Sequence, residues 1–221
     1  LKAGVDTIEH GAPLTDELLK LFKKNGLGNA SSLTCTLSPA LPFAVLSPEK
    51  THSTHVQKVN GRVVYEGVAT ATRQALANGI PVGLGTDSAC PFVTHYDMWR
   101  EVVYFQRHTG VTPEFALHTA TLKNAQLLGV ANETGSIETG KSADLIVLDA
   151  NPLDDLCALR NVEQVYMAGK PVKYKAKHLP KIDAELDGIM NGLDNDPFVS
   201  EWNIASEKKS LNPFAKRGTK E

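Results

Sequence analysis

A short apolar run that ends in a carboxylate, Ile80 to Ser88, is the feature that most constrains how this chain can fold. Its apolar residues alternate as in a buried strand, and a turn signal precedes them. Gly83 and Gly85 carry no side chain, so another backbone or a ligand can approach closely. Asp87 follows at the carboxyl end of the strand. In an α/β barrel that end faces the active site, so Asp87 is a candidate for chemistry, with helix capping as the alternative.

A second polar strand end lies near the start of the chain. Val5 to Ile8 suits a short strand, and His10 follows it closely, with Gly11 freeing the backbone just beyond. A lone histidine at a strand end is often structural, but His10 repeats the pattern seen at Asp87. Ser31 to Leu37 is rich in β-branched residues and predicts another strand between these two.

Helical patterns separate the three predicted strands. Thr15 to Lys24 predicts an amphipathic helix, and Gly61 to Ala77 has apolar residues at helical spacing. Strands that alternate with helices indicate a parallel sheet. From Ser38 to Asn60 we expect a long connecting loop. Its His52 and His55 have a spacing that suits two ligands, but a solvated loop or a helix start is the favoured interpretation.

Two further helices are expected after Asp87. Thr94 can cap a helix that runs to Phe105, which places His95 in its first turn near the carboxyl ends of the strands. His95 could contact a substrate there, and an exposed surface histidine is the alternative. Proline at the first helical position predicts a helix beginning at Thr112 to Glu114.

The character of the sequence changes after Gly129. We predict an α/β part over residues 1–130, strands of a small antiparallel β module over 131–174, and a polar C-terminal extension over 175–221. Glycine, proline and charged residues punctuate this extension. We therefore expect it to be extended or partly disordered.

Composition excludes several classes of protein. The 221 residues carry a formal net charge of -2 and are 42% hydrophobic, which is typical of a globular protein without an electrostatic footprint for nucleic acid or membrane. No apolar run reaches the roughly 20 residues that a membrane helix needs. Three scattered cysteines argue against a disulfide framework and favour a reducing cytoplasm.

Four motifs in a fixed order carry a family likeness: Ile8 to Gly11, Gly85 to Ser88, Thr119 to Ala125 and Gly135 to Leu148. With them the chain resembles the amidohydrolase superfamily, in the branch that holds Xaa-Pro dipeptidases and imidazolonepropionase-like enzymes. The resemblance covers about residues 1–174. Its last motif is the most specific, because it recurs where such chains return from the barrel to a small β-domain.

The resemblance implies the C-terminal part of a metal-dependent hydrolase. The fold class is then α/β, with strands six to eight of a (β/α)8 TIM barrel and part of a small composite β-sandwich domain. His10 matches the metal-binding histidine of the sixth strand. Asp87 matches the aspartate of the eighth, which binds the metal and takes a proton from the attacking water. Imidazole and carboxylate suit zinc, and one or two divalent metals are implied for the full-length parent.

The sequence also departs from this family pattern. It has no His-x-His pair, and the ligands that the family carries on its fourth and fifth strands are missing. A catalytic zinc site usually has three protein ligands, so two leave it incomplete. The chain also begins without Met, at what resembles the last turn of a helix. We therefore expect a fragment of a longer protein that is inactive, zinc-free and aggregation-prone when expressed alone.

The leading hypothesis is that the parent hydrolyses an amide or other carbon–nitrogen bond in a small molecule or dipeptide. The alternative is a non-catalytic relative of the same fold that serves binding or assembly. A nucleotide-binding enzyme is disfavoured, since no glycine-rich phosphate motif follows any strand. The substrate stays open among dipeptides with C-terminal proline, acylated amino acids and cyclic amides. The oligomeric state of the parent is open too, a homo-oligomer included.

Overall fold

A three-stranded parallel sheet lies at the centre of the fold. The computed structural model describes residues 1–24, 31–173 and 176–206. The strands β1 (Thr7–Glu9), β2 (Ser32–Cys35) and β3 (Val82–Leu84) pair in the order β1-β2-β3, in parallel. All three therefore end at the same edge of the sheet, as the alternation of strands and helices predicts.

Helices cover this sheet between and after its strands. Helix α1 (Asp16–Lys24) joins β1 to β2, and α2 (Leu41–Val45), α3 (Pro48–Thr51) and α4 (His55–Ala77) join β2 to β3. Helix α5 (Met98–Thr109) follows the loop after β3 and packs against it. The largest fully buried side chains include Tyr65, Tyr104, Phe22, Phe105, Leu33 and Leu37, contributed by both strands and helices.

The expected loop from Ser38 to Asn60 is wrong, because this segment is largely helical. Helix α4 begins six residues before Gly61, where a capping box fixes its start: the Thr54 hydroxyl accepts from Gln57 N at 3.2 Å, and the Gln57 side chain accepts from Thr54 N at 2.8 Å. Gly61 lies inside the helix. A Cβ there would meet the Cβ of Phe43 at 2.7 Å, so this glycine permits close packing of α2 on α4.

The helix after Asp87 also begins later than the sequence predicts. Helix α5 starts at Met98, and the Thr94 hydroxyl donates to the Asp97 carboxylate at 2.6 Å instead of capping a helix. His95 is consequently an exposed residue in the turn before α5, not a member of its first turn. The wrong start follows from reading Thr94 as an N-cap, when it supports the buried Asp97.

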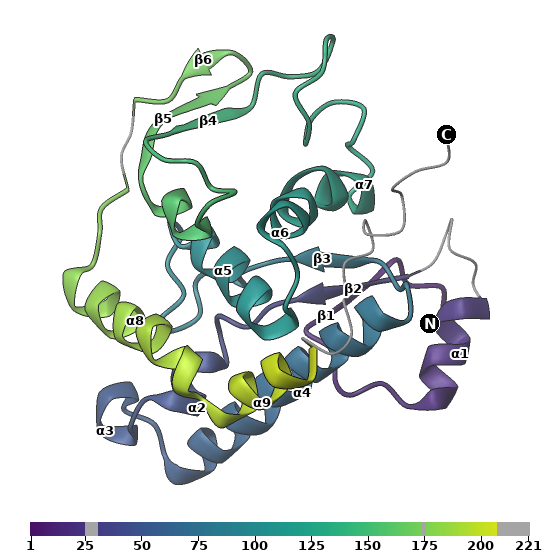
Figure 1. The fold of residues 1–221 in the computed structure, drawn as a ribbon, viewed down its shortest axis with the longest axis vertical. Helices are drawn as coiled ribbons and strands as arrows, with labels where there is room; N and C mark the ends of the chain where they lie inside the picture. Colours follow the sequence, from purple (N-terminus) through teal and green to yellow (C-terminus); the bar gives the residue numbers. More distant parts are fainter. Residues whose placement is uncertain (25–30, 174–175, 207–221) are drawn as a thin grey trace.

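One long helical stretch carries the third motif of the sequence. Helix α6 (Pro113–His118) has the expected proline start, with Thr112 Oγ1 accepting from Phe115 N. It continues into a π-helical turn, η1 (Thr119–Lys123), and then α7 (Asn124–Leu127). Figure 1 shows α6 and α7 beside the central sheet, and η1 packs against β3.

A second, antiparallel sheet is built by the segment after residue 130. Strands β4 (Leu145–Leu148), β5 (Val162–Met167) and β6 (Lys170–Pro171) pair in that order, and the 3-10 turn η2 (Leu156–Arg160) precedes β5. In Figure 1 this sheet lies at the top of the view, apart from the parallel sheet. Turn η2 contacts α5 and connects the two parts of the chain.

The C-terminal segment is not extended, contrary to the expectation for residues 175–221. Within its described part, α8 (Pro180–Gly192), the 3-10 turn η3 (Leu193–Asn195) and α9 (Pro197–Ser206) pack on the body of the protein; residues 207–221 lie outside the described residues. Leu186, Ile189 and Met190 are buried at helical spacing. The sequence did not predict this amphipathic helix, because the segment as a whole has a polar composition.

Two carboxylates fasten these helices, and we call their ion pairs the C-terminal clasp. Asp187 accepts from Arg100 at 2.8 Å and from both terminal nitrogens of Arg160 at 3.0 Å. Asp196 accepts from the two terminal nitrogens of Arg62 at 2.9 and 3.2 Å. Although burial opposes it, hydrogen bonds from the arginines hold the pKa of both aspartates below its ordinary value. We find no candidate membrane span among the helices of the described residues.

Candidate active site

His10 lies directly beyond the end of β1, in a left-handed backbone conformation with φ 61°. Gly11 follows with φ 83°, and its amide donates to Glu9 O at 2.7 Å, which closes a tight turn. A Cβ at Gly11 would meet Leu33 Cδ1 at 2.6 Å, so only glycine fits here without rearrangement. This turn places His10 immediately after the last residue of β1.

Asp87 occupies the corresponding place beyond β3, again with a left-handed backbone at φ 53°. Ala89 and Phe92 in the same loop also have positive φ, at 82° and 65°. Non-glycine residues in this region are uncommon, and such strained positions gather at functional sites. The loop after β3 is therefore unusual in its backbone as well as in its polar tip.

The structure brings His10 and Asp87 together across the end of the sheet. His10 Nε2 and Asp87 Oδ2 are 3.7 Å apart, with β2 lying between their strands. Their side chains are 41% and 50% exposed, so solvent and small molecules can reach both. This is the juxtaposition expected from two strands that end in polar tips.

One pocket includes His10, and a second includes Cys90, which contacts Asp87. One of about 460 Å³ is lined by His10, by Thr36 after β2 and by residues of α2 and α4 that include Phe43 and Val64. This size is within the range of small-molecule sites. Another, of about 510 Å³, is lined by Cys90 and His95 among others.

The family relationship of the chain is settled by comparison with known proteins. Residues 3–172 match the family model described as Amidohydrolase family, which is more than half of the chain. The chain belongs to the amidohydrolase family. The resemblance carried by the four sequence motifs is thereby confirmed.

Solved structures place this amidohydrolase chain near peptidases. A protein of Bifidobacterium longum assigned as a prolidase is 47% identical, with a TM-score of 0.80, over 85% of this chain and 47% of that one. A Xaa-Pro dipeptidase with bound methionine is 30% identical, with a TM-score of 0.64, over 78% of this chain and 41% of that one.

A curated relative extends the likeness to another amidohydrolase. Imidazolonepropionase of Thermoplasma acidophilum is 36% identical over 95 residues, which are 43% of this chain and 23% of that protein. The chain thus spans less than half the length of each of these three relatives.

The donor chemistry of the pair fits part of a zinc site. Imidazole nitrogen and carboxylate oxygen are both zinc ligands, and two bonds of about 2.0–2.2 Å each can span the 3.7 Å between His10 Nε2 and Asp87 Oδ2. Among the described residues, no three His, Cys, Asp or Glu side chains gather closely enough to hold a metal. Within the described residues, the pair could supply two ligands, fewer than the three protein ligands usual in a catalytic zinc site.

Cys90 is the polar neighbour of Asp87 that the sequence did not point to. Its Sγ lies 3.6 Å from Asp87 Oδ2, in hydrogen-bonding geometry. Desolvation, and then the charge of Asp87, raise the pKa of the Cys90 thiol. Cys90 therefore stays a thiol at neutral pH and donates to Asp87, which does not suit a nucleophile.

Glu101 on α5 supports the same edge of the sheet from inside the protein. Its carboxylate accepts from Leu37 N at 2.7 Å, from Ser38 N at 2.9 Å and from the Ser38 hydroxyl. Burial raises the pKa of Glu101 to about 7, against the opposing hydrogen bonds from Ser38 and Leu37. Glu101 thus fixes the chain where it leaves β2. The sequence alone did not distinguish this glutamate from a surface residue of an amphipathic helix.

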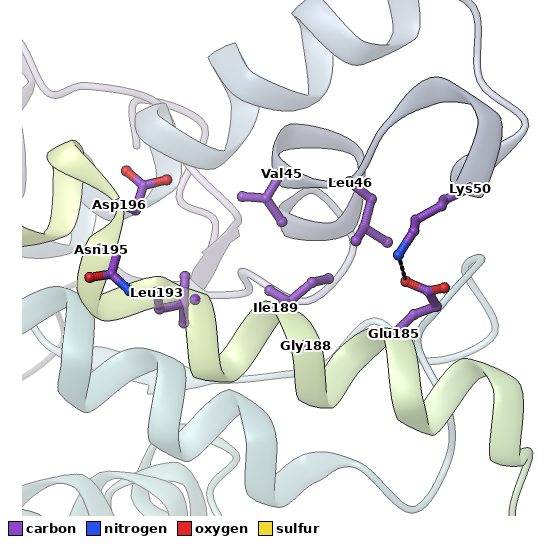
Figure 2. Close-up of a pocket in the computed structure, with 10 residues that line it drawn as sticks. Val45, Leu46, Lys50, Glu185, Gly188, Ile189, Leu193, Asn195 and Asp196 are labelled. Carbon is purple, nitrogen blue, oxygen red and sulfur yellow. Dashed lines mark hydrogen bonds and ion pairs between the residues drawn. The ribbon is translucent and has the colours of Figure 1, made fainter.

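A separate hollow lies between α2–α3 and α8–η3 and is shown in Figure 2. It has a volume of about 370 Å³ and includes neither His10 nor Asp87. Lys50 and Glu185 already pair across its rim at 2.6 Å. We attribute this hollow to the docking of the C-terminal helices, since its charged groups have partners within the protein.

Proposed function

We propose that the full-length protein containing this chain is a zinc-dependent amidohydrolase acting on an amide or other carbon–nitrogen bond. In this proposal β1, β2 and β3 are strands six, seven and eight of a (β/α)8 barrel, and β4 to β6 belong to a small β-sandwich domain. The observation that carries it is the approach of His10 Nε2 to Asp87 Oδ2 at the carboxyl ends of parallel strands.

His10 and Asp87 would each hold the metal through one side-chain atom, with the remaining ligands supplied by the rest of the protein. A bound zinc ion lowers the pKa of water to about 7 and polarises the scissile carbonyl. Asp87 accepts the proton of the attacking water and delivers it to the leaving nitrogen. The 3.7 Å between His10 Nε2 and Asp87 Oδ2 supports this role, because one zinc ion can bond both atoms.

We expect a small-molecule substrate, since the pocket that His10 lines has the volume of a small-molecule site. The relatives favour a dipeptide with C-terminal proline or a cyclic amide, and acylated amino acids share the same scissile bond. His95 lines the pocket that also holds Cys90, the neighbour of Asp87. We propose His95 as a substrate contact, which shifts KM more than kcat when it is replaced.

The deciding experiment measures zinc and hydrolysis together in the full-length protein. His10→Asn keeps a residue that tolerates the left-handed backbone but removes the imidazole ligand. We expect a large loss of bound zinc and of activity against a panel of Xaa-Pro dipeptides and cyclic amides. Asp154→Asn is the matched control, since Asp154 is exposed and remote in sequence from the pair. Full activity without bound metal would refute the proposal.

A further inference from the structure

The last residue of β3, Leu84, is bonded on its outer edge by a side chain. Leu33 N donates to Pro81 O and Gly85 N donates to Cys35 O, so the backbone groups of Pro81 and Gly85 face β2. Backbone groups alternate along a strand, and those of Leu84 therefore face the opposite edge. On that edge, a neighbouring strand or some other partner must satisfy them.

Asn124 is this partner. Its Oδ1 accepts from Leu84 N at 2.9 Å, and its Nδ2 donates to Leu84 O at 2.9 Å. One amide side chain thus satisfies both backbone groups of a residue 40 positions away in the sequence. A paired strand would provide the same two bonds, so in the barrel proposed above the pairing of β3 with the first strand ends before Leu84.

Two local features bring the amide within reach. Gly83 leaves room for it, since a Cβ there would lie 2.9 Å from Asn124 Oδ1 and 3.0 Å from Leu127 Cδ1. The π-helical turn Thr119–Lys123 ends immediately before Asn124. A π-turn inserts one residue into the helix and rotates everything after it by about 100°, and such turns are frequent at functional sites.

The position of this contact is informative. Asp87 follows Leu84 by three residues, so Leu84 is the last strand residue before the strained loop that carries the carboxylate. Cys35 O holds Gly85 N on the inner side at 3.1 Å, and Asn124 holds Leu84 on the outer side. The strand end is therefore clamped from both sides just before Asp87.

We propose that Asn124 is a positioning residue for the hydrolase: it fixes the carboxyl end of β3 and thereby sets the placement of Asp87 opposite His10. The proposal rests on the function proposed above. It treats the Thr119–Ala125 motif as a support of the reaction centre in addition to its packing role. Small displacements of a reacting group can cost large factors in rate, so loss of the clamp acts on kcat.

The test compares Asn124→Ala with Leu127→Ala in the full-length protein. Both variants remove a contact with the same strand, but only the first removes the amide. At a temperature where both are folded, we expect Asn124→Ala to lower kcat about tenfold with KM changed less than twofold. Leu127→Ala should lower the Tm and leave kcat within twofold. A kcat within twofold for Asn124→Ala, or an equal loss in both variants, overturns the proposal.

Hydrogen exchange of the segment 82–87 separates this proposal from the proposed activity. We expect exchange at Leu84 to accelerate at least about tenfold in Asn124→Ala and not in Leu127→Ala, whether or not the protein hydrolyses any tested substrate. If the wild type shows no hydrolysis, the proposed function fails while the exchange result still decides whether Asn124 holds the strand end. Unchanged exchange in Asn124→Ala shows that it does not.

Discussion

Charged side chains are exposed at the carboxyl edge of the parallel sheet, whereas those of the C-terminal clasp are bonded within the protein. At the sheet edge, His10 and Asp87 face each other across 3.7 Å, about half exposed and on strained backbone. In the clasp, Asp187 and Asp196 each accept at least two hydrogen bonds from arginines. Groups whose bonding capacity is filled hold a structure together, whereas groups with unused capacity can bind something else.

Helix α5 links the two regions through adjacent residues. Arg100 reaches Asp187 in the clasp, and Glu101 reaches Leu37 and Ser38 at the end of β2. Both side chains are almost completely buried. The Glu101 carboxylate thus supports the edge of the sheet that carries the site, and the Arg100 guanidinium supports the C-terminal helices. Substitutions at one residue or the other can separate these two roles.

The largest expected effect is a loss of catalytic rate on substitution at the carboxyl edge of the parallel sheet. Asp87→Asn keeps the shape and tolerates the left-handed backbone, but it removes the proton acceptor and weakens metal binding. We expect the kcat of the full-length protein to fall at least about a hundredfold from lost general-base catalysis. The unfolding free energy should stay within about 0.5 kcal/mol of the wild type, as for other exposed sites. A loss of stability with near-normal turnover would show that Asp87 has a structural role like that of the clasp aspartates.

The clasp should show the opposite response. Asp187→Ala leaves the buried Arg100 without this partner and is expected to lower the unfolding free energy by about 3 kcal/mol in denaturant titrations. We take the low end of the usual range because the Asp187 side chain is 31% exposed. Arg160→Ala, at a half-exposed partner, should cost about 1 kcal/mol or less. Equal losses of unfolding free energy in Asp187→Ala and Arg160→Ala would show that the pair with the buried Arg100 adds nothing to the stabilising effect of Asp187.

A third test uses the pH dependence of stability near the sheet. Burial raises the pKa of Glu101 to about 7, so its contribution is present below pH 4.5 and is lost as the pH rises to about 7. Burial lowers the pKa of His108 to about 4, so its contribution is present above pH 6.5 and is lost as the pH falls to about 4. Between pH 4.5 and 6.5 the two slopes oppose each other and cancel.

Single variants should expose each slope. In Glu101→Gln we expect stability to rise with pH across this window by about 1.4 kcal/mol per unit, and in His108→Gln to fall by a similar amount. Thermal unfolding at several pH values, with the wild type as reference, measures both. A Glu101→Gln profile as flat as that of the wild type would contradict the assignment to these two groups.

The smallest effect concerns the wall of the pocket beside His10. Thr54→Ala removes the capping box at the start of α4 and should cost about 1 kcal/mol of unfolding free energy. Because Thr54 lies outside the pocket that Gln57 and Gly61 line, turnover of the folded protein should not change. A change in KM would mean that the helix start also shapes the pocket.

Sequence patterns sufficed for the features that repeat along the chain. The strand–helix alternation predicted the parallel order, and two strands with polar tips predicted that His10 and Asp87 meet. The predicted start of α4 was wrong because glycine can either end a loop or permit close packing inside a helix. Gly61 does the second. The bonds of Asn124 and Glu101 were missed because they join segments about 40 and 63 residues apart, and no local pattern reveals such pairs.

The left-handed backbone at His10 and Asp87 has an evolutionary consequence. Glycine would occupy either position without the strain, which is about 1 kcal/mol for a residue with a Cβ. Selection for stability alone would therefore drive both positions toward glycine. A lineage that no longer needs the reaction should lose the imidazole and the carboxylate early, while Asp187 and Asp196 persist. Glycine at these two positions, beside an intact clasp, would identify family members that have kept the fold and abandoned the chemistry.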